Sequence, residues 1–576
     1  MLPGVFVRVK SSPNSPRQGV QIVASSREGG KIKQRILRHV GVADNPEELR
    51  RLKVLAQTLL GQMLEEESAE LLLAGGKPSG SGKAPAGGRH RNQDDRQALK
   101  VDLRHLREER RNITGIHAIY GRLFDELGFG RVMATPSAHR GPVGLLKQMV
   151  LARLACPSSK RGSVRDLGER FGVQLSLPAV YRMLDLVDAP AQDRLRDLAY
   201  TAAAGLFGQK ITLAFYDCTT LYFESFDEDS LRTKGFSKDN LFTQTQVVLA
   251  LAVTVEGIPL GYELFPGNTF EGNTFKLLLE RIQTKWKPTE LVVVADGAML
   301  SEANIQLLEE RKLSYIVGAR LKSLKGPIAR QVLALGRPPR PEDKDGEDSR
   351  KPSVDSIPVD ERSRLVVSFS PTRARKDAHE RQKMIDKARK RLEKTAQVKP
   401  LVGKQGYRRF LKLDGKCQVQ LDEDAVNQAA AWAGRHGVRT NRLSMPAEGV
   451  LEQYHGLWQV EDCFRVSKHD LRFRPIFHWT ADRIQAHVAI CFMALCCVRH
   501  LMYRVKLQQG AMSAEAIRRA LMSVQVSVYE DTSTGHRYEL PGRWLTEAEK
   551  VYKTMGIKPQ SAARKLPPTT IGRSAL

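Results

Sequence analysis

A series of apolar segments between residues 211 and 320 constrains the fold of this chain more than any other feature. Three segments in succession have the β-branched and aromatic content of strands: ITLAFYD, TQTQVVLALAVTVE and IPLGYELF, with EGIP as a tight turn between the last two. The segments that follow alternate between helix and strand: NTFKLLLERIQTKW, LVVVADG, SEANIQLLEERK and SYIVGAR. Three consecutive strands followed by alternating strands and helices predict a mixed α/β sheet flanked by helices.

Two aspartates follow these apolar strands directly. Asp217 ends ITLAFYD and Asp296 follows LVVVA, although aspartate is a residue type depleted in strands. Each has a simple structural explanation when taken singly, because the end of a strand is often exposed to solvent. Two such residues at the ends of two strands indicate a catalytic or ligand-binding role instead. Asp239 in FSKDN is the reserve candidate if Asp217 has only a structural role.

The net charge indicates what the chain binds. The sequence has 91 Lys and Arg against 64 Asp and Glu, which gives a formal net charge of +27. Such an excess favours a polyanionic partner, because each Lys or Arg that contacts a phosphate releases a counterion bound to the nucleic acid. Between Arg373 and Lys394 the expected helix RARKDAHERQKMIDKARKRLEKTAQVK has ten basic residues against four acidic ones. The alternative is a basic protein with a solvated surface, but we predict a nucleic-acid partner and place this helix near a phosphate backbone.

Cysteine use and hydropathy bear on location. Seven scattered cysteines argue against a disulfide scaffold and for a reducing compartment. The most apolar segment, AHVAICFMALCCV, is too short to span a bilayer and is bounded by Arg483 and Arg499. We therefore expect a buried core helix there and a soluble, cytoplasmic protein.

A third carboxylate lies in a polar helical stripe downstream. If YHGLWQVEDCFRVSKHD is helical, residues spaced by four, three, four and three share one face, and these are Tyr454, Trp458, Glu461, Arg465 and Lys468. A solvated charged face is the alternative, but tyrosine and tryptophan fit solvent poorly. The stripe is therefore a candidate functional surface centred on Glu461.

Asp217, Asp296 and Glu461 can serve one reaction if a cation joins them. Three carboxylates brought together repel one another and hold protons unless a metal ion neutralises them. Oxygen-only ligands suit magnesium or manganese rather than zinc. Two such ions about 4 Å apart can activate an attacking oxygen and stabilise a leaving one in a phosphoryl displacement. This hypothesis requires that the three carboxylates converge within reach of shared ions.

The order of these carboxylates resembles that of the DDE transposases of bacterial insertion sequences. More narrowly, the third block resembles the tyrosine-arginine-glutamate-lysine signature of insertion sequence family four and its long-chain relatives, whose spacing Tyr454, Glu461 and Lys468 match. Leu457 stands where the signature has arginine, and nearby Arg465 is a candidate substitute. The similarity also includes PGNTF and FRPIFHWTADRIQAHVAICFMAL, and so extends over about residues 207–500.

The resemblance implies a ribonuclease H-like domain in which Asp217, Asp296 and Glu461 hold two magnesium ions, with manganese as a substitute. Water and then a freed 3′-hydroxyl would attack phosphodiesters at the element ends and in target DNA. It further implies a bacterial, nucleoid-associated homodimer acting on paired ends of double-stranded DNA. Two alternatives stay open: a nuclease of this fold without strand transfer, and a catalytically inactive DNA-binding relative.

The same resemblance assigns DNA-binding roles to the polar stripe. Tyr454, Arg465 and Lys468 would position the DNA terminus, with Lys468 against phosphate. Members of that family often carry an insertion between the second and third carboxylates, and the separation of Asp296 and Glu461 supports one here. The predicted organisation is an N-terminal α+β region (1–75), a flexible linker (76–98), a helical region with a candidate helix-turn-helix (99–206), the catalytic core in two parts (207–325 and 447–505), the insertion with its basic helix (326–446) and a C-terminal tail (506–576).

Overall fold

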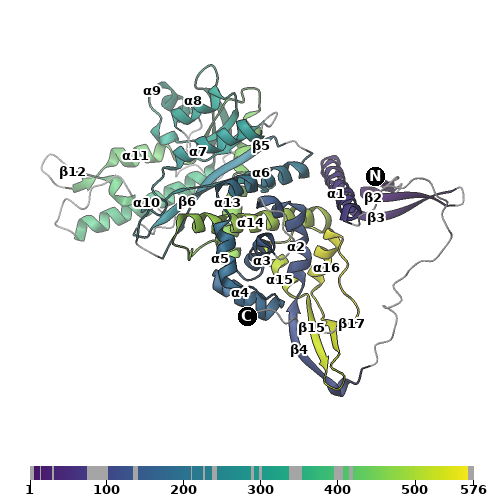
Figure 1. Cartoon of the computed structure of the whole chain (residues 1–576). Helices are drawn as coiled ribbons and strands as arrows, with labels where there is room; N and C mark the ends of the chain where they lie inside the picture. The colour runs from purple at the N-terminus through teal and green to yellow at the C-terminus, as the bar shows by residue number, and fades with distance from the viewer. Residues whose placement is uncertain are drawn as a thin grey trace.

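The computed structural model describes residues 5–12, 15–28, 31–43, 45–73, 101–133, 141–208, 211–224, 227–235, 243–286, 291–297, 301–335, 353–394, 406–413 and 419–567. The predicted linker and Asp239 lie outside these residues. Figure 1 shows an N-terminal strand–helix unit on one side, a central body and a small sheet that projects at its lower end.

An eight-stranded mixed sheet in the order β10-β11-β14-β9-β8-β5-β6-β7 forms the centre of the molecule. Its first five strands along the chain are β5 (Leu213–Tyr222), β6 (Gln246–Thr254), β7 (Pro259–Pro266), β8 (Val292–Ala295) and β9 (Ser314–Ala319). β5, β6 and β7 are antiparallel neighbours, whereas β8 runs parallel to β5 and β9 parallel to β8. Three antiparallel strands continued by two parallel ones in this order form a ribonuclease H-like sheet, which confirms the predicted fold class.

Helices cover both faces of this sheet. α7 (Glu271–Arg281) and α8 (Glu302–Glu310) pack on one face; α12 (Ala447–His455), α13 (Trp458–Arg465) and α14 (Ala481–Gln509) pack on the other. Successive residues of a strand point to opposite faces. On β5, Leu213 and Phe215 therefore join the core under α13 and α14, while Ala214 and Tyr216 join the core under α7 and α8.

The insertion extends the central sheet. β10 (Ser353–Pro358), β11 (Arg364–Phe369) and β14 (Arg435–Thr440) add three antiparallel strands beyond β9. The remaining elements form a lobe at this end, seen at the left of Figure 1. They are α9 (Gly326–Ala334), α10 (Pro371–Lys394), η8 (Gly406–Phe410), β12 (Leu411–Leu413), β13 (Val419–Leu421) and α11 (Glu423–Ala431).

The helical region before the sheet packs around α14. Its helices are α2 (Gly115–Glu126), α3 (Pro142–Ala155), α4 (Lys160–Phe171), α5 (Leu177–Asp185) and α6 (Ala189–Leu206). α4, a turn with Gly172 in the left-handed conformation, and α5 form the predicted helix, turn and helix; DNA contact by α5 stays a prediction. Among the described residues, α14 alone is long and apolar enough to cross a bilayer, and 94% of its most apolar window is buried within the protein, as a core helix is.

Both ends of the chain add small sheets. β1 (Val5–Ser12), β2 (Ser15–Glu28) and β3 (Lys31–Ala43) form an antiparallel sheet against α1 (Pro46–Leu73). Part of the segment expected as a C-terminal tail is folded: β15 (Gln525–Asp531), β16 (Arg537–Pro541) and β17 (Arg564–Lys565) join β4 (Leu106–Ile113) in the projecting sheet. α15 (Ala514–Met522) and α16 (Thr546–Met555) pack beside α2. Short helical turns are η2 (Leu103–His105), η3 (Phe129–Val132), η4 (Ile282–Trp286), η6 (Leu321–Ser323) and η9 (Val466–Asp470).

Candidate active site

Strand register brings Asp217 and Asp296 to neighbouring positions. The last pair between β5 and β8 joins Tyr216 to Ala295, so each aspartate lies one residue beyond it. Odd-numbered residues of β5 and even-numbered residues of β8 face the core under α12 to α14, and both aspartates therefore point to that face. Asp217 is not at a strand end as predicted, because β5 continues to Tyr222 along β6; only its pairing with β8 stops there.

Glu461 reaches the same place from the covering helix. It lies in the first turn of α13, which packs across β5 and β6. Asp217, Asp296 and Glu461 line one cavity of about 800 Å³. The three carboxylates thus converge on a common space.

The carboxylates do not form a ready-made ion site. Asp217 Oδ1 accepts the N–H of Cys218 at 2.7 Å, and Asp296 Oδ1 accepts the N–H of Gly297 at 2.5 Å. In the part of the chain that the structure describes, no group of three or more His, Cys, Asp or Glu side chains is arranged to hold one metal ion. The donor chemistry fits magnesium, since all three side chains offer oxygen. Shared coordination would require the three carboxylate groups, which already line the cavity, to move closer to one another.

The cavity is acidic in a strongly basic protein. Glu448 and Glu452 of α12 line it together with the three candidate carboxylates, whereas Arg373 is its one Lys or Arg among the described residues. Five carboxylates facing one guanidinium contrast with a chain of net charge +27. Such a concentration of negative charge attracts cations.

Tyr454 and His436 form a neutral part of the cavity wall. Their ring centroids lie 5.1 Å apart. Burial raises the pKa of Tyr454, and the nearby Asp296, Asp217 and Glu461 raise it further. Burial also lowers the pKa of His436 to about 4, helped by the positive charge of Arg373 and by His455. At neutral pH both side chains are therefore uncharged hydrogen-bonding groups.

The predicted polar stripe divides between cavity and surface. The expected single helix breaks at Gly456 and Leu457, between α12 and α13, and η9 follows as a π-helical turn. Tyr454, Trp458 and Glu461 line the cavity, and Trp458 is 56% exposed at it.

Arg465 and Lys468 are not among the residues that line the cavity. Arg465 is paired with Asp462 at 2.8 Å and with Asp470 at 3.7 Å, and Lys468 is half-buried in η9. The roles assigned to these two cations stay predictions. The structure does not bring Arg465 to the place where a substitute for the signature arginine is needed.

The insertion supplies site residues that the sequence did not reveal. Ser368, Arg373 and His436 line the cavity from β11, α10 and β14. The basic helix was recognised by its composition, but nothing distinguished Arg373 from its other cations. His436 had no signal, since its place depends on the pairing of β14 with both β9 and β11.

Comparisons with known proteins identify the family of this chain. A family model described as the transposase DDE domain matches residues 209–497, and one for the N-terminal domain of IS1634 family transposases matches residues 7–71. No curated protein matches this chain. The cryo-EM structure of the piggyBac transposase synaptic complex with hairpin DNA is similar at 12% sequence identity and a TM-score of 0.36, over 71% of this chain and 76% of that chain.

The DDE match spans the central sheet, the insertion and most of α14, and it contains Asp217, Asp296 and Glu461. The chain belongs to the family of transposases with a DDE domain.

Proposed function

We propose that this protein is a metal-dependent DNA transposase that hydrolyses phosphodiesters at the ends of an insertion sequence and transfers the freed strands to target DNA. One observation carries the proposal: Asp217, Asp296 and Glu461, from three separate elements, line a single acidic cavity in a chain of net charge +27. A surface evolved only to bind phosphate would not concentrate carboxylates in its cavity, because they repel the ligand.

The proposed mechanism assigns each side chain a task at this cavity. Asp217, Asp296 and Glu461 would hold two magnesium ions, which activate the attacking oxygen and stabilise the leaving oxygen when bound. Tyr454 remains protonated at neutral pH, so its hydroxyl can donate a hydrogen bond to a phosphate oxygen. Trp458 adds an exposed aromatic ring to the lining of the cavity.

We also propose that the protein belongs near the branch of insertion sequence family four. The spacing of Tyr454, Glu461 and Lys468 supports this placement, and Leu457 at the arginine position is the departure from it. In this branch we expect a homodimer that holds paired element ends in the bacterial cytoplasm, in association with the nucleoid.

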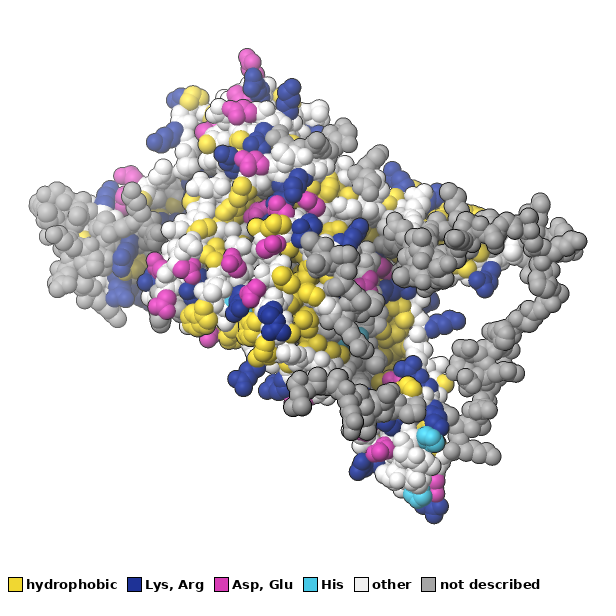
Figure 2. Space-filling model, viewed as in Figure 1, with side chains coloured by type: hydrophobic (Ala, Val, Ile, Leu, Met, Phe, Trp, Pro, Cys, Tyr) yellow, Lys and Arg dark blue, Asp and Glu magenta, His cyan; other side chains and the backbone are white. Residues whose placement is uncertain are grey.

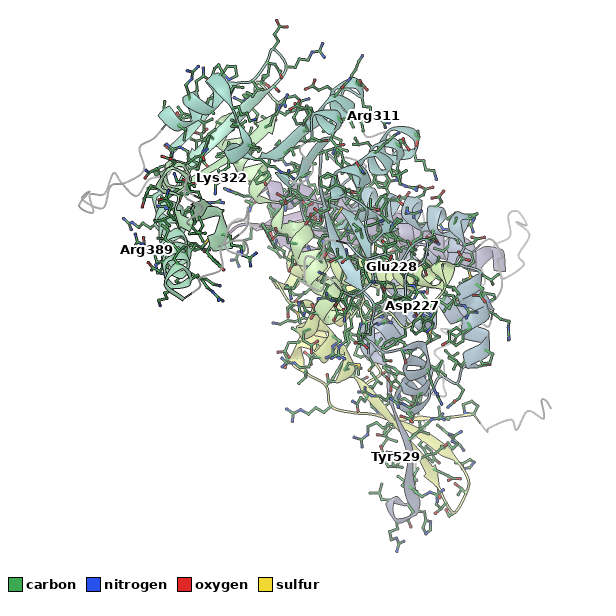
Figure 3. The ribbon with its side chains drawn as sticks, turned by 90° about the vertical axis from the view of Figure 1, so that its left-hand side faces the viewer. Asp227, Glu228, Arg311, Lys322, Arg389 and Tyr529 are labelled. Atoms are coloured by element: carbon green, nitrogen blue, oxygen red, sulfur yellow. The ribbon has the colours of Figure 1, made fainter. Side chains whose placement is uncertain are left out.

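The exposed face of α10 supports double-stranded DNA as the partner. Lys383, Lys387, Arg389 and Lys390 are exposed there, and within the described chain they make no ion pair with Asp or Glu. Dark blue side chains gather over this region at the left of Figure 2. Figure 3 places Arg389 of α10 and Lys322 of η6 on the same lobe, far from Tyr529 of the projecting sheet. A basic face that begins beside the cavity fits a path for a phosphate backbone.

A strand-transfer assay tests the proposed function. The full chain is incubated with a duplex carrying the DNA that flanks its coding sequence, a supercoiled target plasmid and magnesium. A transposase yields end cleavage and joined products. Cleavage without joining would favour a nuclease of the same fold, and DNA binding without cleavage would favour an inactive relative.

A further inference from the structure

Arg373 is the cation that the insertion contributes to the acidic cavity. It lies near the start of α10, and it is the one Lys or Arg among the described residues lining the cavity. Its side chain is exposed, and within the described chain it makes no ion pair with a carboxylate. An exposed guanidinium without an acidic partner is available to a ligand, and its planar fork matches phosphate geometry.

The start of α10 is fixed against β14, and Arg373 is therefore held at the cavity. Ser370 N donates to Gly434 O at 2.9 Å, and Gly434 N donates to Asp377 Oδ2 at 2.9 Å. Gly434 has φ +76°, and a Cβ there would lie 2.6 Å from the Cβ of Ala374. Only glycine fits both this conformation and this close approach.

His436 offers a second group beside Arg373. Its Nδ1 is buried and has no hydrogen-bond partner, although buried polar atoms are normally paired. Arg373, His436 and Tyr454 all line the cavity, and the rings of His436 and Tyr454 are in contact. A phosphate group in the cavity could accept hydrogen bonds from Arg373 and Tyr454, and the enclosed Nδ1 of His436 would have to be uncovered before it could donate one.

The other candidate cations are engaged elsewhere. Arg465 is shared between Asp462 and Asp470, and Asp462 also accepts from Arg499 at 2.6 Å. Leu457, at the arginine position of the signature, lines the cavity with an apolar side chain. The positive charge at this cavity is thus supplied by the insertion and not by the helix that carries Glu461.

We infer that Arg373 is a positioning residue that binds a phosphate of the DNA strand held at the carboxylate cavity, with His436 and Tyr454 beside it. This inference rests on the proposed function, because it takes DNA as the ligand. It adds that the insertion completes the site, so the second wall of the cavity is a phosphate-binding wall.

The first test measures the salt dependence of binding. Affinity for the flanking-DNA duplex is measured in calcium over a range of salt concentrations for the wild type, Arg373→Ala, Arg373→Lys and the control Arg330→Ala. Arg330 is exposed on α9 and does not line the cavity. Arg373→Ala should weaken binding about tenfold and reduce the salt slope by about 0.9, the value of one phosphate contact. Arg373→Lys should keep the slope and lose part of the affinity, because lysine cannot form the bidentate contact.

The second test separates direct contact from a structural role. Methylphosphonate linkages neutralise one phosphate at a time along the duplex. In the wild type one position near the cleaved end should weaken binding, and Arg373→Ala should lose its sensitivity to that position alone. Gly434→Ala keeps the guanidinium but displaces the start of α10, and it should lose the same sensitivity.

The outcomes distinguish the two proposals. An unchanged slope together with retained sensitivity to every methylphosphonate in Arg373→Ala would overturn the inference while leaving the transposase assignment intact. A wild-type protein that binds no DNA would overturn both. A reduced slope with loss of sensitivity at one phosphate supports the inference even before any cleavage is measured.

Discussion

The two walls of the cavity are built in different ways. The carboxylate wall comes from β5, the residue after β8, and α13, all anchored in the central core: Phe215 and Val294 are buried beside the aspartates. The opposite wall comes from the insertion, where Arg373 and His436 depend on strands added at the edge of the sheet. One wall therefore carries negative charge, whereas the other carries hydrogen-bond donors; the strands of both walls are buried in the sheet. We interpret the first as the wall for chemistry and the second as the wall for the DNA.

The largest expected effect comes from the carboxylate wall. Asp217→Ala, Asp296→Ala and Glu461→Ala should each reduce end cleavage by about a thousandfold or more, because each removes an oxygen ligand that the proposed reaction requires. DNA binding should persist, since removing a negative charge does not weaken the attraction for phosphate. Gel assays of cleavage and binding measure the two effects separately.

A matched control for these substitutions is Glu549→Ala, which is exposed on α16 and is not among the residues that line the cavity. It should leave cleavage unchanged. Normal cleavage by Glu461→Ala would show that α13 contributes no metal ligand. It would contradict the assignment of the chemistry to the carboxylate wall.

A second prediction concerns the junction of the walls at Tyr454. A Cβ at Gly318 on β9 would lie 2.4 Å from the Tyr454 hydroxyl and 2.9 Å from Gly297 N, so Gly318→Ala must move Tyr454 or the segment after Asp296. We expect cleavage to fall by roughly ten- to a hundredfold and the free energy of unfolding to fall by about 1–3 kcal/mol, as for overpacking.

Two further variants serve as comparisons for the loss of cleavage and stability in Gly318→Ala. Tyr454→Phe removes only the hydroxyl and should cost less activity than Gly318→Ala, with little loss of stability. Gly61→Ala in α1, where nothing lies within 4 Å of the added Cβ, should leave both quantities unchanged or slightly raise stability. Equal activity of Gly318→Ala and the wild type would mean that the placement of Tyr454 is not needed.

These two predictions also show what a sequence can and cannot reveal. Apolar runs identified β5 and β8, and their alternation places Asp217 and Asp296 on one face, because neighbouring parallel strands share a register. The end of β5 was misplaced, since strand length there depends on β6 and not on the residues after Asp217. That Asp217, Asp296 and Glu461 hold shared ions stays a prediction: they line one cavity, but among the described residues no three ligand side chains are arranged around one ion, and a sequence pattern contains no side-chain rotamers.

The polar stripe and the insertion wall were harder to predict for a different reason. A uniform helical period assigned Arg465 and Lys468 to the face of Tyr454. Arg465 is instead paired with Asp462 and Asp470, and Lys468 lies in the π-helical turn η9, where the α-helical period ends. Arg373 reaches the cavity only through long-range pairing among β9, β14 and β11. The periodicity of apolar residues within one segment cannot predict which distant strands pair.

A smaller effect should distinguish the DNA-facing side of the insertion from the rest of the surface. Lys383→Glu and Lys390→Glu on α10 should each weaken duplex binding by several-fold and lower the salt slope by about 0.9. Lys550 is exposed on α16, and Lys550→Glu is a control with the same change of charge. It should weaken duplex binding less than the two α10 substitutions. In the projecting sheet, Arg107 is paired with Glu530 at 2.9 Å and Arg111 with Glu108 at 3.0 Å. If Lys550→Glu had the larger effect, the DNA path would lie on the helical body and not along α10.

The smallest effect comes from His436 and is a pH dependence of stability. The pKa of His436 is about 4 in the folded chain, where it faces Arg373, His455 and Asp296, against about 6.5 when unfolded. Between these values the unfolded chain binds a proton that the folded chain does not, so this contribution is full above pH 6.5 and is lost as pH falls towards 4. The loss should amount to at most about 2 kcal/mol at pH 5. Denaturant unfolding of the wild type and His436→Gln at pH 7 and pH 5 measures it: the variant should lose less stability on acidification. An equal loss in both would mean that His436 is charged in the folded state, and the insertion wall would then carry two cations instead of one.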